Sequence, residues 1–313
     1  MTQSAIQVND LHKAFGDNNA VQGVSFEVQQ GEIFSLLGPN GAGKTTTISM
    51  LATLLRPDQG DAFVMGHSIR KEATAVRAVL GVVPQEIALY EDLSARENLL
   101  FWGKMYGLRG GVLKTRVDEA LEIIGLTERA SGQLSKFSGG MKRRVNIAAA
   151  LLHRPAVIFM DEPTVGIDPQ SRRNILDSVV ALKEQGMTVL YTTHYMEEAQ
   201  ELSDHIAIMD HGKLISLGTH AELVKIVGEA DRIRLAIHNP RESLDQIWGM
   251  VPGVKQVSSK DGVFTILALN GHQVLPRLFE AAGDQAAQIT SVEIQQPDLE
   301  AVFLHLTGRA LRD

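Results

Sequence analysis

The N-terminal part of the chain carries apolar residues in patterns typical of strands. Residues 24–28 alternate apolar and polar side chains, and residues 6–8 do so over a shorter stretch. Residues 33–37 are more uniformly apolar, which is typical of a strand buried on both faces. Residues 44–55 then follow a helical spacing, and Pro57 interrupts it. The pattern predicts strands of two sheets followed by one helix.

Residues 84–155 have a different character, because helical spacing dominates and no convincing strand occurs. Ser94 and Glu97 have the spacing of a capping box, which marks the start of a helix. Residues 117–124 continue the helical spacing. We interpret this part of the chain, at about residues 86–154, as an inserted helical subdomain.

Strand patterns return after Pro155 and alternate with helices, which is typical of an α/β fold. Asp168 and Pro169 stand where the N-cap and first turn of a helix belong. Thr219 and Glu222 have the spacing of a second capping box. The expected strands are 157–160, 187–191, 206–209 and 213–217, and the expected helices are about 169–185, 194–202 and a short one ending near residue 228.

The residues beyond 228 predict a second, smaller α+β domain. The order of elements is strand, helix, strand, strand, helix, strand, which is the ferredoxin-like order. A final helix from Pro297 places Leu299, Val302, Phe303 and Leu306 on one packing stripe. We therefore expect domains at residues 1–228 and 229–313. The expected strands of the second domain are 232–237, 254–257, 263–269 and 289–294, and its helices are 242–248 and 274–282.

Composition narrows the possible function classes. The chain has 313 residues, a formal net charge of -7 and no cysteine. An acidic balance argues against general nucleic-acid binding, so no nucleic-acid partner is expected. The absence of cysteine excludes disulfides and thiol nucleophiles and fits a reducing compartment. The N-terminus does not have the pattern of a signal peptide, and no apolar stretch approaches the length of a membrane span.

One segment carries the chemistry of phosphate binding. Residues 38–45 match the pattern G-x-x-x-x-G-K-[ST] and follow a predicted buried strand. In this pattern backbone N–H groups close around phosphates, Lys44 reaches the β and γ phosphates, and Thr45 ligates Mg²⁺. An ordinary glycine-rich turn is the alternative, which the preceding strand disfavours. The matching residues are Gly38, Pro39, Asn40, Gly41, Ala42, Gly43, Lys44 and Thr45.

Three other groups accompany this loop. Asp161 ends a predicted buried strand and is placed to ligate Mg²⁺, while its neighbour Glu162 is suited to polarise an attacking water. Residues 138–140 (Ser-Gly-Gly) precede a helix, whose free N–H groups form an anion site. His194 follows an apolar strand and is expected on the same sheet edge as Asp161 and the loop. Taken alone, the Ser-Gly-Gly helix start and the histidine are more often structural features.

In this order the motifs resemble the ATP-binding subunit of ATP-binding cassette (ABC) transporters over roughly residues 4–222. The resemblance implies a P-loop NTPase (RecA-like) core with an antiparallel β subdomain. It identifies residues 38–45 as the Walker A motif, with Thr46 beside it, and residues 157–162 as the Walker B motif. The family signature corresponds to Ser138, Gly139 and Gly140.

The same resemblance assigns roles to single residues. Gln85 is similar to the Q-loop glutamine, a ligand of Mg²⁺ together with Thr45 and Asp161. Asp168 is similar to the D-loop aspartate, and His194 to the switch histidine. Phe15 stands where the family has an aromatic residue that stacks on adenine.

The signature of this chain departs from the commonest form, Leu-Ser-Gly-Gly-Gln. Its outer positions are Phe137 and Met141, while the phosphate-facing Ser-Gly-Gly is intact. The basic residues 142–144 that follow favour a solvated helix face at least as much as a role near the nucleotide. We therefore keep the signature assignment and expect no contact from a glutamine side chain at position 141.

The resemblance also implies partners and a mechanism. Two such domains, in a homodimer or a dimer with a related ATPase chain, would bind each ATP between the Walker A loop of one chain and the signature of the other. Glu162 would act as the base, and His194 would hold the γ-phosphate. The helical subdomain would dock on a separately encoded membrane-spanning permease. This places the chain peripherally at the cytoplasmic face of the cell membrane.

The C-terminal residues 297–309 are similar to those of bacterial export ATPases of the daunorubicin-resistance and multidrug type. An exporter is therefore the favoured interpretation. A soluble ABC-type ATPase of DNA repair or translation is the main alternative, and a P-loop kinase outside the family is a third. The single motif set and the roughly 110 residues between the two Walker motifs disfavour the DNA-repair and translation classes.

Overall fold

The computed structural model describes residues 3–228, 230–238, 244–260, 262–283 and 288–308. The chain divides into two compact units, a first one up to His220 and a second one over Ala221–Ala310. The sequence predicted the limit between the domains at residue 228. The limit between the two units lies earlier, after His220, which is the first residue of the short helix α8 (His220–Lys225). No helix in the described part of the chain is both long and apolar enough to span a bilayer.

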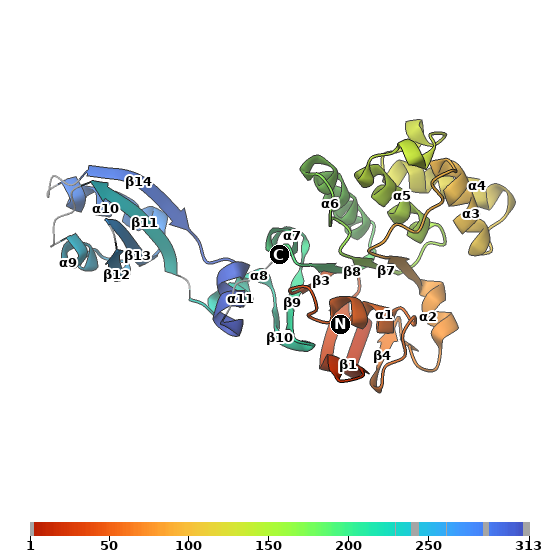
Figure 1. Ribbon diagram of the computed structural model, residues 1–313, viewed down its shortest axis with the longest axis horizontal. Coiled ribbons are helices and arrows are strands. Elements are labelled where there is room, and N and C mark those ends of the chain that lie inside the picture. The colour runs from red at the N-terminus through yellow and green to blue at the C-terminus, as the bar shows by residue number, and fades with distance from the viewer. Residues whose placement is uncertain (1–2, 229, 239–243, 261, 284–287, 309–313) are drawn as a thin grey trace. The chain divides into compact units, whose positions relative to one another are not determined.

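A six-stranded sheet forms the centre of the first unit (Figure 1). Its strands are parallel except for one antiparallel edge strand, and its central strands are fully buried because both faces are covered. Helices α5 and α6 lie on one side and α1 on the other (Figure 1). The strands in spatial order are β10 (Lys213–Gly218), β9 (His205–Asp210), β3 (Ile33–Leu37), β8 (Thr188–Thr193), β7 (Val157–Asp161) and β6 (Leu80–Val83).

A smaller antiparallel sheet packs on the α1 side of the central sheet. The strands expected at residues 6–8 and 24–28 lie inside its two long strands. Gly60 is required at its third strand, because a Cβ there would lie 2.1 Å from the carbonyl oxygen of Asp10. Its strands are β1 (Ser4–Phe15), β2 (Asn18–Gln29), β4 (Gln59–Val64) and β5 (His67–Ser68), and α1 (Lys44–Leu51) and α2 (Ala73–Val79) complete this region.

The expected helical subdomain is present between β6 and β7. Ser94 and Glu97 form the predicted capping box, with both reciprocal hydrogen bonds in place. Leu99, Leu121 and Val145 are fully buried in a core that belongs to this subdomain. The helices are α3 (Ala95–Met105), α4 (Gly110–Ile123) and α5 (Gly139–Leu151), and two short 3-10 turns lie at Thr127–Arg129 and Leu134–Lys136.

Two helices follow β7 and β8. Asp168 caps α6 (Pro169–Glu184) through a 2.9 Å hydrogen bond from the Ser171 amide to its Oδ1, with Pro169 in the first turn as expected. Helix α7 (Met196–Leu202) begins after β8 and packs beside β3. The carboxyl ends of β3, β7 and β8 therefore open onto one edge of the sheet, where ligands bind in open α/β folds.

The second unit has the predicted ferredoxin-like order, with all neighbouring strands antiparallel. Ile233, Leu235 and Ile237 alternate into a core of its own, which includes Trp248 and Phe264. The first residues of the helix expected at 242–248 lie outside the described residues. The elements are β11 (Ala230–His238), α9 (Leu244–Gly249), β12 (Val254–Lys260), β13 (Val263–Leu269), α10 (Gly271–Gly283), β14 (Gln288–Gln295) and α11 (Leu299–Thr307).

Candidate functional site

The phosphate loop connects β3 to α1. Lys44 is 4 % exposed, and its Nζ donates to the carbonyl oxygens of Gly38 at 2.7 Å and Pro39 at 3.0 Å. Gly43 precedes the helix with a φ of 100°, and a Cβ there would lie 2.4 Å from the carbonyl oxygen of Ala20. The loop is thus closed around its own lysine, and α1 points its free N–H groups into it.

The two predicted carboxylates lie against this loop. Asp161 and Glu162, at the end of β7, are each 4 % exposed. The Thr45 hydroxyl donates to Oδ1 of Asp161 at 3.2 Å, and Nζ of Lys44 lies 3.0 Å from Oε1 of Glu162. Buried carboxylates need such partners, because burying an unpaired charge costs several kcal/mol.

Thr192 on β8 fixes both carboxylate residues, a role that the sequence did not reveal. Its hydroxyl donates to Oδ1 of Asp161 at 2.6 Å and accepts from the backbone N–H of Glu162 at 2.9 Å. In the sequence, Thr192 is recognisable only as a member of the short polar segment that ends at His194.

Two more predicted residues converge on the other oxygen of Glu162. Nδ1 of His194 lies 3.4 Å from Oε2 of Glu162, and Nε2 of Gln85 donates to the same oxygen at 3.4 Å. Glu162 therefore contacts side chains that come from three different loops of the sheet edge. The arrangement can orient a water beside a phosphate and accept its proton.

A pocket of about 390 Å³ opens at these residues. Phe15 lines the pocket and is 51 % exposed, so its ring is accessible to a planar ligand. The pocket is lined by Phe15, Asn18, Ala20, Asn40, Gly41, Ala42, Gly43, Lys44, Thr45, Thr46, Gln85 and Glu162. Asp161 and His194 reach this group through their contacts with Thr45 and Glu162.

The predicted signature and Asp168 do not line this pocket and form a second cluster instead. Ser138 caps α5 by accepting from the Met141 amide at 3.3 Å. A Cβ at Gly140 would lie 2.2 Å from the Cβ of Ser171 on α6, the helix that Asp168 caps. Glycine thus allows the starts of α5 and α6 to approach closely. One chain therefore carries two separate groups of predicted site residues.

The basic residues 142–144 differ from the expectation of a solvated helix face. Lys142 pairs with Glu91 at 2.5 Å and Arg144 donates to the Ile124 carbonyl at 2.8 Å, but Arg143 is 2 % exposed. Burial lowers the pKa of Arg143, and electrostatic interactions with Tyr191 and Asp161 oppose this shift without cancelling it. The face that Arg143 shares with Ile147 and Ala150, at i, i+4 and i+7, was the available signal.

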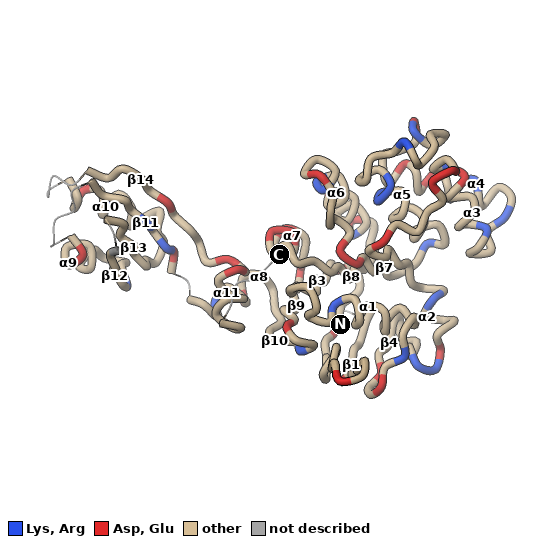
Figure 2. The backbone as a smooth tube through the Cα atoms, viewed as in Figure 1, with Lys and Arg blue, Asp and Glu red and all other residues tan. Residues whose placement is uncertain are grey.

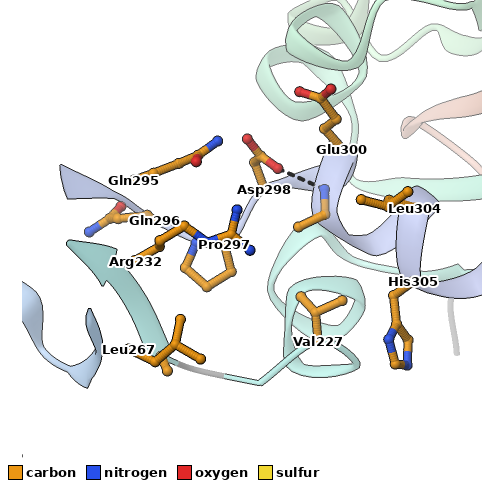
Figure 3. Close-up of a pocket in the computed structure, with 12 residues that line it drawn as sticks. Val227, Arg232, Leu267, Gln295, Gln296, Pro297, Asp298, Glu300, Leu304 and His305 are labelled. Carbon is orange, nitrogen blue, oxygen red and sulfur yellow. Dashed lines mark hydrogen bonds between the residues drawn. The ribbon is translucent and has the colours of Figure 1, made fainter. Parts of the chain in front are cut away.

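Charge is distributed in short segments over the described residues, with Lys and Arg interspersed among Asp and Glu (Figure 2). Within the second unit a pocket of about 510 Å³ lies between the sheet and α11 (Figure 3). Asp298 at its rim accepts from the Ala301 amide at 2.9 Å and caps α11, and Arg232 faces the same space (Figure 3). None of the predicted site residues lines this second pocket.

A closed phosphate loop, a threonine beside an aspartate, and a glutamate contacted by lysine, glutamine and histidine define a P-loop ATPase site. The family model for ABC transporters matches residues 21–165. The chain belongs to the ABC transporter family and is an ATP-binding, ATP-hydrolysing subunit of it.

Relatives match over their whole length. The chain is 47% identical to the linearmycin resistance ATP-binding protein LnrL of Bacillus subtilis (strain 168), covering 98% of this chain and 100% of the relative. It is 38% identical to the daunorubicin resistance ATP-binding protein DrrA3 of Streptomyces coeruleorubidus, covering 98% and 97%. It is 37% identical to the Nod factor export ATP-binding protein I of Paraburkholderia xenovorans (strain LB400), covering 100% of both.

Solved structures agree with the fold. An ATP-binding subunit of an ABC transporter superposes with a TM-score of 0.64 at 30% identity, covering 72% of this chain and 93% of that one. The ATP-binding cassette MJ0796, described as a dimer in a post-hydrolysis state bound to ADP and Pi, superposes with a TM-score of 0.62 at 26% identity, covering 68% and 98%.

Proposed function

We propose that the chain is the ATPase of an exporter and drives a separately encoded membrane-spanning permease from the cytoplasmic face of the cell membrane. Whole-length similarity to proteins named for linearmycin and daunorubicin resistance and for Nod factor export supports this direction of transport. None of these relatives is named for DNA repair or translation, so no observation favours that alternative. The helical subdomain is the proposed docking surface for the permease.

The observation that carries the mechanism is the division of the predicted site within one chain. Lys44, Gln85 and Glu162 line one pocket, whereas Ser138 and Asp168 lie in a separate cluster. We infer that the signature of a second chain closes over the pocket of the first, so that two chains share each ATP. The dimeric cassette MJ0796 bound to ADP and Pi supports such a state.

The residues of the pocket fit MgATP. Phe15 would stack on the base, and backbone N–H groups of residues 40–46 with Lys44 would hold the phosphates. Among the described residues no group of three or more His, Asp or Glu side chains forms a metal site, so Thr45, Asp161 and Gln85 would share the ion with phosphate oxygens. Bound Mg²⁺ would supply charge neutralisation at the β and γ phosphates.

The described side chains can then carry out hydrolysis. Glu162 accepts the proton of the attacking water, or positions that water, from its place beside Lys44. His194 contacts Glu162 and holds the γ-phosphate, so that the developing charge meets preorganised donors. Hydrolysis removes the γ-phosphate that joins the two chains, and the dimer reopens.

The proposal is tested on the complex purified from membranes. The affinity-tagged chain should co-purify with a multi-span membrane protein from detergent-solubilised membranes. Transported compounds should stimulate the ATPase activity of that complex. A complex that carries Glu162→Gln should co-purify equally well but show no stimulation, because the base is lost. Recovery of the chain without any membrane-spanning partner would contradict the transporter assignment.

A further inference from the structure

Arg143 is a buried cation that binds the backbone of the catalytic loops. It lies one turn into α5 and is 2 % exposed. Its guanidinium donates to the carbonyl oxygens of Pro84 at 2.5 Å, Glu162 at 3.0 Å and Pro163 at 2.7 Å. These carbonyls belong to two loops, one after β6 and one after β7.

The burial of this charge is costly unless its donors are satisfied. Within the part of the chain that the structure describes, no Asp or Glu side chain forms an ion pair with Arg143. Carbonyl dipoles therefore stabilise it at close range, and the Asp161 carboxylate adds a more distant favourable charge. A planar guanidinium offers five donors in a fixed fork, a geometry that can bind several carbonyls at once. A single lysine ammonium could not donate to all three carbonyl oxygens with the geometry that the guanidinium provides.

The contacts fall at the residues that form the hydrolytic site. Pro84 directly precedes Gln85, whose side chain contacts Glu162. Glu162 has a φ of 44°, in the left-handed region that costs a residue with a side chain about 1 kcal/mol or more. Its N–H bonds to Thr192 and its carbonyl to Arg143, so both backbone groups of this strained residue are held.

We propose that Arg143 is a positioning residue for ATP hydrolysis, which fixes the backbone of Glu162 and Gln85 from α5. This inference rests on the proposed role of Glu162 as the base. Arg143 does not line the pocket, so it acts through Glu162 and not on the nucleotide. Because α5 also begins with the signature, the same helix that reaches the partner's ATP sets the geometry of the local glutamate.

The test compares Arg143→Met with Arg144→Met in the full-length chain. Arg144 is the matched control, because it is the next residue of the same helix, half-buried, and donates to a backbone carbonyl at Ile124, away from the pocket. Arg143→Met should lower kcat at least about tenfold and change KM for MgATP by less than about threefold, since Lys44 and the loop are untouched. Arg144→Met should keep kcat within about twofold.

A second measurement separates positioning from loss of folding. Adding Arg143→Met to Glu162→Gln should cause no further loss of residual turnover, because both changes remove the same function. Compared with Arg143→Met, the Arg143→Lys variant should recover part of kcat, while the melting temperatures of the two variants should be the same. If Arg143→Met does not fold, Arg143→Lys is judged by the same kcat and KM criteria.

The inference is overturned if Arg143→Met keeps kcat within twofold, if Arg144→Met loses as much, or if the double variant falls well below Glu162→Gln alone. Failure of the proposed function has a different outcome. In that case the Glu162→Gln variant itself would retain normal turnover, whatever the effect of Arg143→Met on kcat.

Discussion

At the residue scale, the site consists of buried charged side chains, and hydrogen bonds to the backbone of Glu162 fix its position among them. Glu162 is contacted by Lys44, Gln85 and His194, but its backbone is held by Thr192 and Arg143. The three contacting side chains determine what the carboxylate can do. The two backbone contacts determine where it lies.

Thr192→Val tests the importance of this placement, because it removes one hydroxyl and keeps the shape. Asp161 loses its 2.6 Å donor and the Glu162 amide loses an acceptor. We expect unfolding free energy to fall by about 1–3 kcal/mol. Misplacement of Glu162, the proposed base, should lower kcat by about 10- to 100-fold.

The control for this prediction is Thr188→Val on the same strand. The Thr188 hydroxyl accepts from the Gly31 amide at 3.0 Å, at the opposite end of β8 from the site. The Thr188→Val variant should lose about as much unfolding free energy as Thr192→Val, measured in urea, but should keep its turnover. Equal kcat values for the two variants would show that Thr192 has no role beyond stability.

The sequence predicts those candidate site residues whose proposed role depends on a local motif. Lys44 and Thr45 follow from a glycine pattern that dictates its own backbone, and Asp161 from the end of a buried strand. Arg143 was missed because its acceptors are backbone carbonyls. Every residue has a carbonyl, so no residue type at position 84, 162 or 163 identifies the partner.

At the scale of elements, those with a local sequence signal were predicted, whereas those formed by tertiary contacts were not. The buried strand β3 and the capped helices α3 and α6 were predicted, because their signals lie within each element. The sequence pattern predicts no element within residues 59–83, although these residues contain β4, β5, α2 and β6. Strand β5 has two residues and β6 has four, and each is defined by pairing with a neighbour. Tertiary contacts, not local pattern, create such elements.

Two residues after the end of α5, His153 contacts β6 in a way that we expect to depend on pH. His153 stacks on Tyr106 with ring centroids 4.1 Å apart, and its Nε2 lies 3.1 Å from the Leu80 carbonyl oxygen. Burial lowers the pKa of His153 below its ordinary value of 6.5, and the bond to Leu80 opposes this shift. Folding therefore favours the neutral ring relative to the unfolded chain.

The lowered pKa of His153 makes the stability of the fold depend on pH. Between the lowered folded pKa and the unfolded one, the unfolded chain binds more protons, so stability falls as pH falls through this window. His153→Phe should make the free energy of unfolding less dependent on pH between about 7.5 and 5.5. Urea titrations of both proteins at the two pH values measure this. An unchanged difference between the pH values would show that His153 does not contribute.

At the scale of the whole molecule, each half of the proposed composite site has its own packing support. The pocket depends on the central sheet, and the Ser138 cluster on the close approach of α5 to α6. The second unit has a separate core around Trp248. Assembly of two chains, rather than movement within one, is therefore the proposed route to a complete site.

Mixing two inactive variants tests this assembly directly. Lys44→Ala removes the lysine proposed to hold the phosphates, and Ser138→Arg blocks the proposed signature, so each homodimer should have no competent site. In a mixed dimer one site carries both defects, whereas the other combines an intact loop with an intact signature. Random pairing makes half of the dimers mixed, so the mixture should regain about a quarter of wild-type ATPase activity. If mixed dimers form but hydrolyse no ATP, the two chains do not share their sites.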